Sequence, residues 1–451
     1  MGNRRNDLGH CAESPHRGCI RLGLSVAAPS FSRSVAVKSQ RVVVVGQGYV
    51  GLPVAMLAVA RGFEVTGYDV DADRVARLRA GRSFIGDVPD ARLQASLQSG
   101  LYRVNADEDE LRGFDIAVIA VPTPALAGEP DLSYVESAAK ALAVHLRPGA
   151  TVILESTTWP GTTEEVVVPL LETSGLRAGA DFAVGYSPER INPGDGLAGM
   201  AAVPKVVSGI DAASLQQVAG FWAALVETVV AAPDIRTAEF SKLLENVFRL
   251  VNVSLVNELT QHAGALGVDM WEAVRLAATK PYGYMPFTPS AGAGGHCLPV
   301  DTKYLTWCIR QTGGVAAVVE AADEVNARMP GWVAGRIVAG LAARGHRPAG
   351  ARVLAIGITY KRDVADTRES CAIQVVAALR AHGINVQVYD PLVAADRADV
   401  TGELTAAMIQ AADVVVVLVD HSCVDLEMIA EARYVFDARG CLAGRANVEV
   451  L

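Results

Sequence analysis

A short β-branched run opens into a glycine-rich loop near residue 46, and this junction constrains the fold more than any other feature. The run RVVVV spans residues 41–45, and Gly46, Gly48 and Gly51 follow it in a G-x-G-x-x-G pattern. An apolar stretch at helical spacing comes next. A strand, a tight glycine turn and a helix in direct succession are typical of the first unit of a doubly wound parallel sheet.

The same loop predicts a dinucleotide site. Glycines let a pyrophosphate approach the N-terminus of the helix, where backbone N–H groups point at it. Asp69 closes the next strand and is placed to accept hydrogen bonds from a ribose diol. A carboxylate at this position repels a 2′-phosphate, so the sequence favours NAD over NADP.

Apolar strands and helical stretches alternate in two blocks. In the first block, further buried strands are expected in FDIAVIAVPTP, ATVILESTT and DFAVGYSPER. Such strands, separated by helices, indicate a parallel sheet covered on both faces. After Pro330 the alternation resumes, but its first turn reads GITYKRD, so a second dinucleotide site is not expected. Between the blocks, residues 237–267 contain no proline and predict one helix of about eight turns.

These patterns predict an α/β fold with two Rossmann-like, doubly wound parallel-sheet domains joined by a long central helix. Residues 1–40 are predicted to be an N-terminal extension that is either disordered or translated from a wrongly assigned start. The predicted domains after it are a NAD-binding domain at 41–232, a central helical region at 233–330 and a second Rossmann-like domain at 331–451.

Composition narrows the class of function. The 451 residues carry a formal net charge of −9, which argues against a nucleic-acid or membrane-surface partner because both select basic surfaces. The seven cysteines are scattered without a CxxC pair. That usage indicates a reducing, cytoplasmic compartment and predicts no metal site. No apolar run approaches the length that spans a bilayer.

Cys297 is the predicted nucleophile. It lies in GAGGHCLPVDTKYL, after Gly294 and Gly295 and before Pro299, a context that suits the first turn of a helix. A thiol at a helix N-terminus has a lowered pKa. Asp301 follows one turn later and could orient a water or a base. The alternative interpretation is a small core cysteine, and the adjacent His296 is assigned a local structural role.

A nicotinamide site together with a nucleophilic thiol predicts a four-electron oxidation. The thiol can hold an aldehyde as a thiohemiacetal, allow a second hydride transfer, and leave a thioester for water to cleave. Lys242, Asn246 and Arg249 lie at i, i+4 and i+7 on one face of the central helix. The lysine could stabilise a developing oxyanion there; the alternative is a solvated polar stripe.

Other polar residues gather where strands end, which is where open parallel sheets bind ligands. In the first block they form VPTP (121–124), ESTTWPGTT (155–163) and YSPER (186–190). In the last block the basic residues are suited to a diphosphate; they are Lys361, Arg362, Arg368 and Arg439.

From residue 41 to about 445, these motifs in this order resemble the UDP-glucose/GDP-mannose dehydrogenase family of nucleotide-sugar 6-dehydrogenases. The similarity is closest to the UDP-N-acetylhexosamine branch, through KPYGYMPFTPSAGAGGHCLPVDTKYL and ITYKRDVADTRES. The resemblance implies an N-terminal NAD domain, a central helix at the interface of a homodimer or higher homo-oligomer, a C-terminal domain that binds the UDP-sugar, and UDP-N-acetylglucosamine or an epimer as substrate.

The resemblance also implies residue roles. The catalytic set is Cys297 as nucleophile, Lys242 and Asn246 at the oxyanion, Asp301 as base or water-positioner, and Thr157 and Glu189 near the hydroxyl and the hydrolytic water. The implied cofactor residues are Gly46, Gly48, Tyr49, Val50, Gly51, Asp69, Arg74, Val121, Pro122, Thr123, Ser156, Thr157 and Arg368. The implied substrate residues are Glu189, Arg190, Lys242, Asn246, Arg249, Gly294, Gly295, Lys361 and Arg439.

The chain departs from the pattern of the branch at three places. Thr302 follows the aspartate where proline is usual, Ser290-Ala291 replaces Gly-Pro, and Cys371 replaces a proline after RES. The first two line the expected uridine loop, so they bear on the substrate more than on the reaction. The alternatives are oxidation of UDP-glucose or UDP-N-acetylmannosamine, a two-electron dehydrogenase with a structural Cys297, and a UDP-sugar-binding protein without chemistry.

Overall fold

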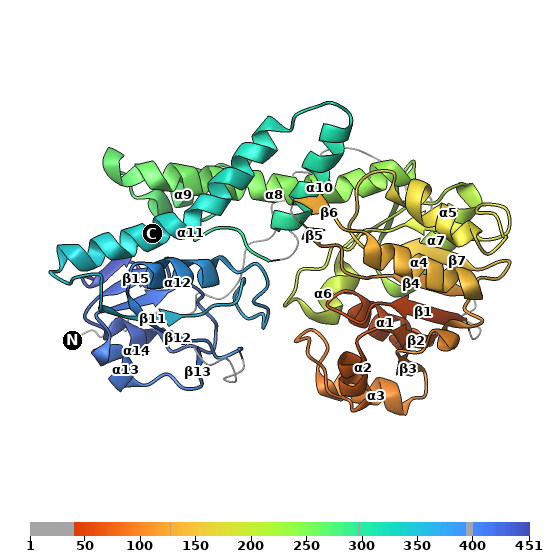
Figure 1. Cartoon of the computed structure of the whole chain (residues 1–451), viewed down its shortest axis with the longest axis horizontal. Coiled ribbons are helices and arrows are strands. Elements are labelled where there is room, and N and C mark those ends of the chain that lie inside the picture. Colours follow the sequence, from red (N-terminus) through yellow and green to blue (C-terminus); the bar gives the residue numbers. More distant parts are fainter. Residues whose placement is uncertain (1–39, 127, 296–297, 394–399) are drawn as a thin grey trace, which may run out of the picture.

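Two α/β lobes lie side by side, and long helices run along both of them (Figure 1). The computed structural model describes residues 40–126, 128–295, 298–393 and 400–451. None of the helices in these ranges is both long and apolar enough to cross a bilayer.

The first lobe is built on a six-stranded parallel sheet in the order β3-β2-β1-β4-β7-β8. This order is that of a dinucleotide-binding Rossmann domain, in which the strand order reverses between β1 and β4. The strands are β1 (Arg41–Val45), β2 (Glu64–Tyr68), β3 (Tyr102–Asn105), β4 (Ile116–Ile119), β7 (Thr151–Leu154) and β8 (Ala183–Tyr186).

Helices cover both faces of this sheet, because alternate side chains of the strands point to opposite sides. Val42 and Val44 of β1 pack with α1, α3 and α7, whereas Val43 and Val45 pack with α4, α5 and the start of α8. The helices are α1 (Gly51–Ala60), α2 (Ala72–Arg79), α3 (Asp90–Gln98), α4 (Ser133–His145), α5 (Val168–Glu172), α6 (Gly196–Ala202) and α7 (Ala212–Leu225). Two small strand pairs complete the lobe: β5 (Ala125–Leu126) with β6 (Glu129–Pro130), and β9 (Lys205–Val207) with β10 (Val229–Ala231).

The second lobe repeats the architecture with the order β13-β12-β11-β14-β15-β16, again all parallel. The prediction of two Rossmann-like domains is confirmed. Its strands are β11 (Arg352–Ile356), β12 (Asn385–Tyr389), β13 (Val400–Thr401), β14 (Val414–Val417), β15 (Val435–Asp437) and β16 (Val448–Val450). One face packs on α11 and α12 (Cys371–Ala381), and the other on α13 (Ala406–Ala411) and α14 (Leu426–Ala430).

The central region is helical, as predicted. Helix α8 (Ile235–Ala263) begins at Asp234, whose side chain accepts a hydrogen bond from the Thr237 N–H. It packs against α10 (Leu298–Gln311) and α11 (Ala317–Ala343), and α9 (Met270–Ala277) follows its end. Helix α11 runs through Pro330, so the central region and the last lobe share one continuous helix.

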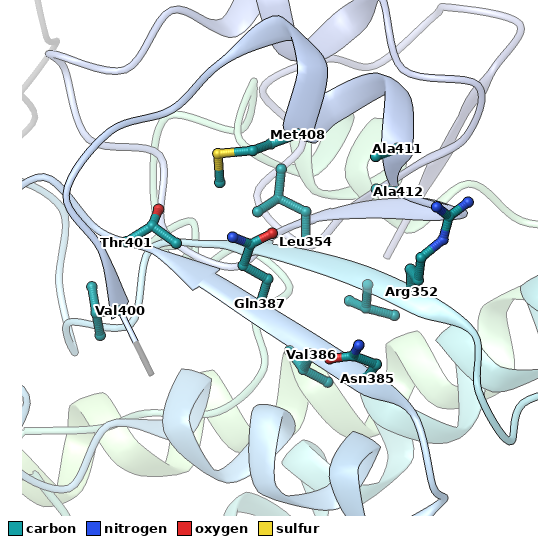
Figure 2. A pocket seen from close by; sticks show the side chains of 11 residues that line it. Arg352, Leu354, Asn385, Val386, Gln387, Val400, Thr401, Met408, Ala411 and Ala412 are labelled. Carbon is teal, nitrogen blue, oxygen red and sulfur yellow. The ribbon is translucent and has the colours of Figure 1, made fainter. Parts of the chain in front are cut away.

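A hollow in the second lobe lies beside β11, β12 and α13 (Figure 2). Its polar lining includes Arg352, Asn385, Gln387 and Thr401, with Met408 of α13 above them. None of the described residues predicted to form the site lines it, so the candidate site is built elsewhere.

Candidate functional site

The glycine loop has the shape that a dinucleotide requires. A side-chain Cβ on Gly46 would come within 2.4 Å of the Ala120 carbonyl oxygen, and one on Gly51 within 1.8 Å of the Gly46 carbonyl oxygen. A Cβ on Gly48 would meet nothing within 4 Å. The outer glycines are therefore required by packing, while the middle one faces open space where a pyrophosphate would lie.

Asp69 ties this loop to the end of β2. Its buried carboxylate accepts hydrogen bonds from the Gln47 N–H at 2.7 Å and the Asp71 N–H at 3.0 Å. Arg74 of α2 forms an ion pair with it at 2.8 Å, and the guanidinium lies 5.5 Å from the centroid of the Phe84 ring. The group predicted to receive a ribose diol thus also shapes the loop, and Arg74 lies beside it.

The remaining predicted cofactor residues of the first lobe lie at neighbouring strand ends. The Ser156 hydroxyl, after β7, donates to the Val121 carbonyl at 2.8 Å and so joins the two loops that follow β4 and β7. Pro122 is exposed, and Thr123 and Thr157 are half-buried. Val50 caps α1, next to Tyr49 in the glycine loop.

A buried polar cluster joins α8 to the first lobe and to α10. Lys242 lies 3.7 Å from the Glu189 carboxylate, and both side chains are buried. One turn along α8, the Asn246 amide donates to Asp301 at the start of α10. The alternative of a solvated stripe does not describe Lys242, which is only 5% exposed; Arg249, further along, is exposed.

Two carboxyl groups in this region have pKa values near neutrality. Burial raises the pKa of Asp301 to about 7, although Lys242 and Asn246 act to lower it. Burial also raises the pKa of Glu239, one turn before Lys242, to about 7. Glu239 accepts hydrogen bonds from the Gly161 N–H at 2.5 Å and the Thr163 N–H at 2.9 Å. A carboxyl with a pKa near 7 can take up or release a proton at working pH, which suits Asp301 to acid–base chemistry.

Cys297 and His296 lie outside the described residues, so the structure describes only the residues before and after them. Gly294 and Gly295 pack closely on the second lobe. A Cβ on Gly294 would come within 2.6 Å of the Glu369 carbonyl oxygen, and a Cβ on Gly295 within 2.9 Å of the Tyr360 ring. Gly295 also has a φ of +85°, which favours glycine.

Two asparagines, neither found by sequence reasoning, hold the loop before the cysteine. Asn257 of α8 accepts from the Ser290 N–H at 2.9 Å, and Asn326 of α11 accepts from the Ala293 N–H at 2.6 Å. Asn326 also donates to the Ala293 carbonyl at 3.0 Å. The Ser290 hydroxyl, one of the departures from the family pattern, lies 3.2 Å from the Asn257 amide nitrogen.

The segment after β11 reaches across to the first lobe. The Lys361 ammonium donates to the Asn192 side-chain oxygen at 2.6 Å and to the Pro193 carbonyl at 2.8 Å. Burial lowers the pKa of Lys361; Asp195 opposes this shift and Arg249 adds to it. The proximity of a second cation is a property expected of a site for an anion such as a diphosphate.

The same segment touches the cofactor loop. The Tyr49 hydroxyl donates to the Ala365 carbonyl at 3.3 Å, and the Arg368 guanidinium lies 5.0 Å from the centroid of the Tyr49 ring. Asp366 orients Arg368 through an ion pair at 2.7 Å. Arg368 therefore extends from the second lobe to the glycine loop, where the family resemblance implied a cofactor contact.

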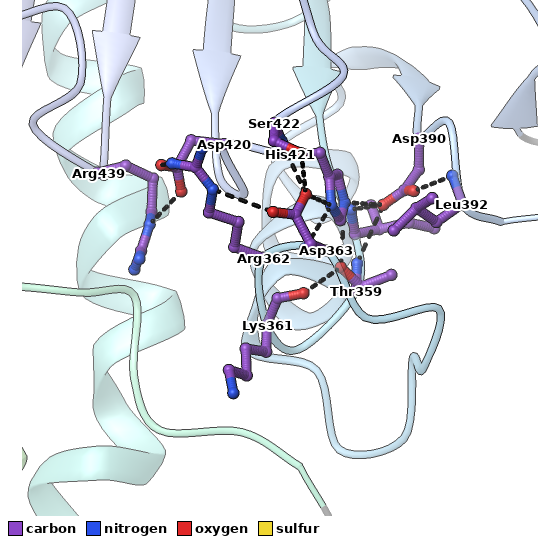
Figure 3. Close-up of polar contacts among 11 residues, drawn as sticks. Thr359, Lys361, Arg362, Asp363, Asp390, Leu392, Asp420, His421, Ser422 and Arg439 are labelled. Atoms are coloured by element: carbon purple, nitrogen blue, oxygen red, sulfur yellow. Dashed lines mark hydrogen bonds and ion pairs between the residues drawn. The ribbon is translucent and has the colours of Figure 1, made fainter. Parts of the chain in front are cut away.

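Behind Lys361, a polar network occupies the carboxyl ends of β11, β12 and β14 (Figure 3). His421 is buried and lies 3.3 Å from the Asp390 carboxylate and 3.2 Å from the Thr359 hydroxyl. The Lys361 ammonium points away from this network (Figure 3).

Asp420 holds the two arginines of the same region. Its carboxylate accepts from Arg362 at 2.8 Å and from Arg439 at 3.0 Å. Arg190, the remaining predicted substrate residue, forms an ion pair with Glu245 of α8 at 2.8 Å and donates to the Pro204 carbonyl at 2.7 Å. Its side chain braces the loop after β8 against α8.

A second buried ion pair was missed by sequence reasoning. Lys205 of β9 contacts Glu155 at the end of β7, and Glu155 is fully buried. The signal for Glu155 is its position directly after an apolar strand and before Ser156 and Thr157. Lys205 has no comparable signal, because a lysine at the start of a short strand is usually solvated.

Comparison with known proteins gives a match along nearly all of the described chain. Three family models match: the UDP-glucose/GDP-mannose dehydrogenase family NAD binding domain at residues 40–226, its central domain at 236–328 and its UDP binding domain at 354–444.

Individual proteins similar to this chain are also nucleotide-sugar dehydrogenases. The chain is 34% identical over 382 residues to UDP-N-acetyl-D-mannosamine dehydrogenase of Pyrococcus horikoshii, covering 84% of this chain and 89% of the relative. It is 37% identical over 369 residues to UDP-N-acetyl-D-glucosamine 6-dehydrogenase of Pseudomonas aeruginosa, covering 80% and 85%. The solved structure of the P. horikoshii UDP-D-ManNAc dehydrogenase matches with a TM-score of 0.83 and 31% identity over 91% of this chain and 98% of that one.

The pKa of Glu239 predicts a pH-dependent stability. Because the folded-state pKa of about 7 exceeds the ordinary value of 4.5, the folded protein binds the proton more tightly, and stability is lost as pH rises from 4.5 through 7. The contribution is at most about 3 kcal/mol. We expect Glu239→Gln to shrink the fall in thermal midpoint between pH 5 and pH 8, with Glu227→Gln, an exposed position between α7 and β10, as control. An unchanged fall in Glu239→Gln would contradict this assignment.

The position of Asp69 predicts its effect on cofactor choice. Asp69→Asn keeps an acceptor but removes the negative charge that repels a 2′-phosphate, so we expect the preference for NAD over NADP to narrow by about tenfold or more. Dissociation constants for NADH and NADPH measure this, with Asp73→Asn, exposed on α2, as the matched control. An unchanged ratio in Asp69→Asn would show that another group sets the preference.

Proposed function

This chain belongs to the UDP-glucose/GDP-mannose dehydrogenase family, and from that premise we propose that it oxidises the 6-hydroxymethyl group of a UDP-N-acetylhexosamine to the uronic acid. The enzyme is a NAD-dependent nucleotide-sugar 6-dehydrogenase with a UDP-binding domain. The observation that carries the proposal is the buried cluster in which α8 brings Lys242 to Glu189 and Asn246 to Asp301. The substrate would be UDP-N-acetylglucosamine or its mannosamine epimer, since relatives of both names match over most of the chain.

The proposed reaction removes four electrons in two steps. When bound, NAD supplies the acceptor for the hydride of each oxidation. In the first step C6 loses a hydride and its hydroxyl loses a proton, which gives an aldehyde; the Cys297 sulfur then bonds to C6, and the aldehyde oxygen takes up a proton to give a thiohemiacetal. In the second, the thiohemiacetal loses a hydride from C6 and the proton of its hydroxyl, and becomes a thioester. Water then cleaves the carbon–sulfur bond, giving the carboxylate and regenerating the thiol.

The buried cluster has the charges that these steps require. The Lys242 ammonium would stabilise the oxyanion formed in each oxidation, with the Asn246 amide beside it. Asp301 would accept a proton, because its pKa of about 7 leaves it able to exchange one at neutral pH. Glu189 and Thr157 would position the hydrolytic water. Lys361, with Arg249 near it, would hold the diphosphate, and Arg439 would meet the nucleotide.

The NADH yield tests the reaction and names the substrate. With limiting UDP-N-acetylglucosamine, UDP-N-acetylmannosamine or UDP-glucose and excess NAD, we expect two NADH per sugar on an N-acetylhexosamine. Cys297→Ser should lose at least a hundredfold in rate because the nucleophile is removed. One NADH per sugar with free aldehyde, or full activity in Cys297→Ser, would contradict the covalent route. Two NADH per UDP-glucose, with none from either N-acetylhexosamine, would identify UDP-glucose as the substrate instead.

We further propose that the enzyme is a homodimer through α8. Large apolar side chains recur along one stripe of this helix and are 44–54% exposed; they are Phe240, Leu244, Phe248, Leu255 and Leu259. A contiguous exposed apolar stripe of this kind is typical of a protein–protein interface.

Light scattering of the eluting protein tests the dimer. Leu244→Glu combined with Phe248→Glu places charges in the middle of the stripe, and we expect the mass to fall to that of one chain. Val144→Glu, at an exposed apolar position of α4, is the control and should leave the mass unchanged. A wild-type protein that elutes as a monomer would refute the proposal directly.

A further inference from the structure

The ion pair of Glu155 and Lys205 lies inside the first lobe, without an obvious part in the chemistry. Glu155 is 0% exposed and Lys205 6%. The Lys205 ammonium contacts the Glu155 carboxylate, and it lies 3.9 Å from the centroid of the Trp222 ring. An ion pair this deep loses the hydration of both charges, and an apolar pair of similar volume is often as stable or more so. Fold stability alone is therefore a weak reason for its presence.

The pair connects the two loops that carry predicted catalytic residues. Glu155 directly precedes Ser156 and Thr157 in the loop after β7. Lys205 also donates to the Pro188 carbonyl at 3.0 Å, and Pro188 directly precedes Glu189 in the loop after β8. One ammonium group thus holds both loops by a side chain on one side and a backbone oxygen on the other.

The pair also interacts electrostatically with the catalytic cluster. Burial raises the pKa of Glu155 and lowers that of Lys205, and their mutual attraction opposes both shifts. The charges of Glu189 and Lys242 act on both members of the pair. Tyr186, buried at the end of β8, lies in the same field, with Glu239, Asp301, Glu155 and Glu189 acting on its hydroxyl.

We propose that Glu155 and Lys205 are positioning residues for the dehydrogenase reaction: Lys205, held by Glu155, fixes the loop of Thr157 and the loop of Glu189 in register with Lys242. This inference rests on the proposed function for its catalytic readout. Among the described residues, Lys205 also contacts the Pro188 carbonyl and the Trp222 ring, and neither Pro188 nor Trp222 is a predicted NAD or diphosphate residue. Loss of the pair should affect turnover more than the binding of either reactant, because Thr157 and Glu189 are predicted catalytic residues of these two loops, whereas most of the predicted NAD and substrate residues lie elsewhere.

The test uses a double variant, because either single substitution leaves one buried charge unpaired and threatens folding. Glu155→Gln with Lys205→Met keeps the volumes and removes both charges. The matched control is Asp115→Asn with Arg147→Met, which removes an ion pair at the opposite end of strands of the same sheet. For both, the measurements are the thermal midpoint, kcat, KM for NAD and sugar, the pH profile of kcat, and hydrogen exchange in residues 155–158 and 187–191.

We expect the double variant to fold and to keep both KM values within about threefold, while kcat falls about tenfold or more. The pH profile of kcat should shift in the double variant, and hydrogen exchange should accelerate in both loops. The control variant, Asp115→Asn with Arg147→Met, should show none of these changes. An unchanged kcat and pH profile in the folded double variant would overturn the proposal and leave the pair a structural one.

Two further outcomes remain decisive. If the double variant does not fold, the variant to measure is Lys205→Arg, which keeps the charge but replaces the compact ammonium that bridges Glu155 and Pro188. A tenfold fall in the kcat of Lys205→Arg supports the proposal, and a kcat equal to that of the wild type overturns it. If the wild-type protein makes no NADH with any UDP-sugar, the proposed function fails. Hydrogen exchange still tests separately whether the pair holds the two loops: unchanged protection of both loops refutes that coupling, and faster exchange in both upholds it.

Discussion

The burial of charge along one face of α8 is the constraint on which the rest of the site depends. Lys242 and Asn246 point from this helix to Glu189 and Asp301, which come from the first lobe and from α10. Charges out of water are costly unless they meet a partner, so these contacts admit few alternative arrangements. The helix therefore fixes the strand-end loops, the start of α10 and the loop before it relative to one another.

One segment of the second lobe contacts both the first lobe and its cofactor loop. After β11 the chain places Lys361 against Asn192, Ala365 against the Tyr49 hydroxyl, and Arg368 over the Tyr49 ring. A domain that binds the nucleotide end of a substrate through Lys361 would consequently act on the cofactor loop at the same time. Binding energy from the remote end of the substrate could thereby be used to align the reacting end.

Sequence reasoning found the features that depend on local pattern. Gly46, Gly48 and Gly51 followed from their spacing after a strand, and the 237–267 helix from its periodicity; the observed helix starts two residues earlier because Asp234 caps it. The buried lysine that pairs with Glu155 had no such signal. Its partners come from β7, the loop after β8 and α7, so only the packed sheet reveals that its charge is enclosed.

The two lobes also show how one architecture gives different ligand sites. In the first, Asp69 accepts from the Gln47 N–H at 2.7 Å, and the glycine loop stays open. In the second, Asp390 accepts from the Ile358 N–H at 2.6 Å, at the equivalent strand end. There, however, His421 packs against the carboxylate, and after Gly357 the turn reads ITYKR, with Thr359 and Arg362 at the positions of Gly48 and Gly51. In the second lobe, a network of side chains fills the space that stays open beside the glycine loop of the first lobe. The turn therefore presents the Lys361 ammonium outward. That position suits a diphosphate bound between the lobes rather than a dinucleotide bound within one lobe.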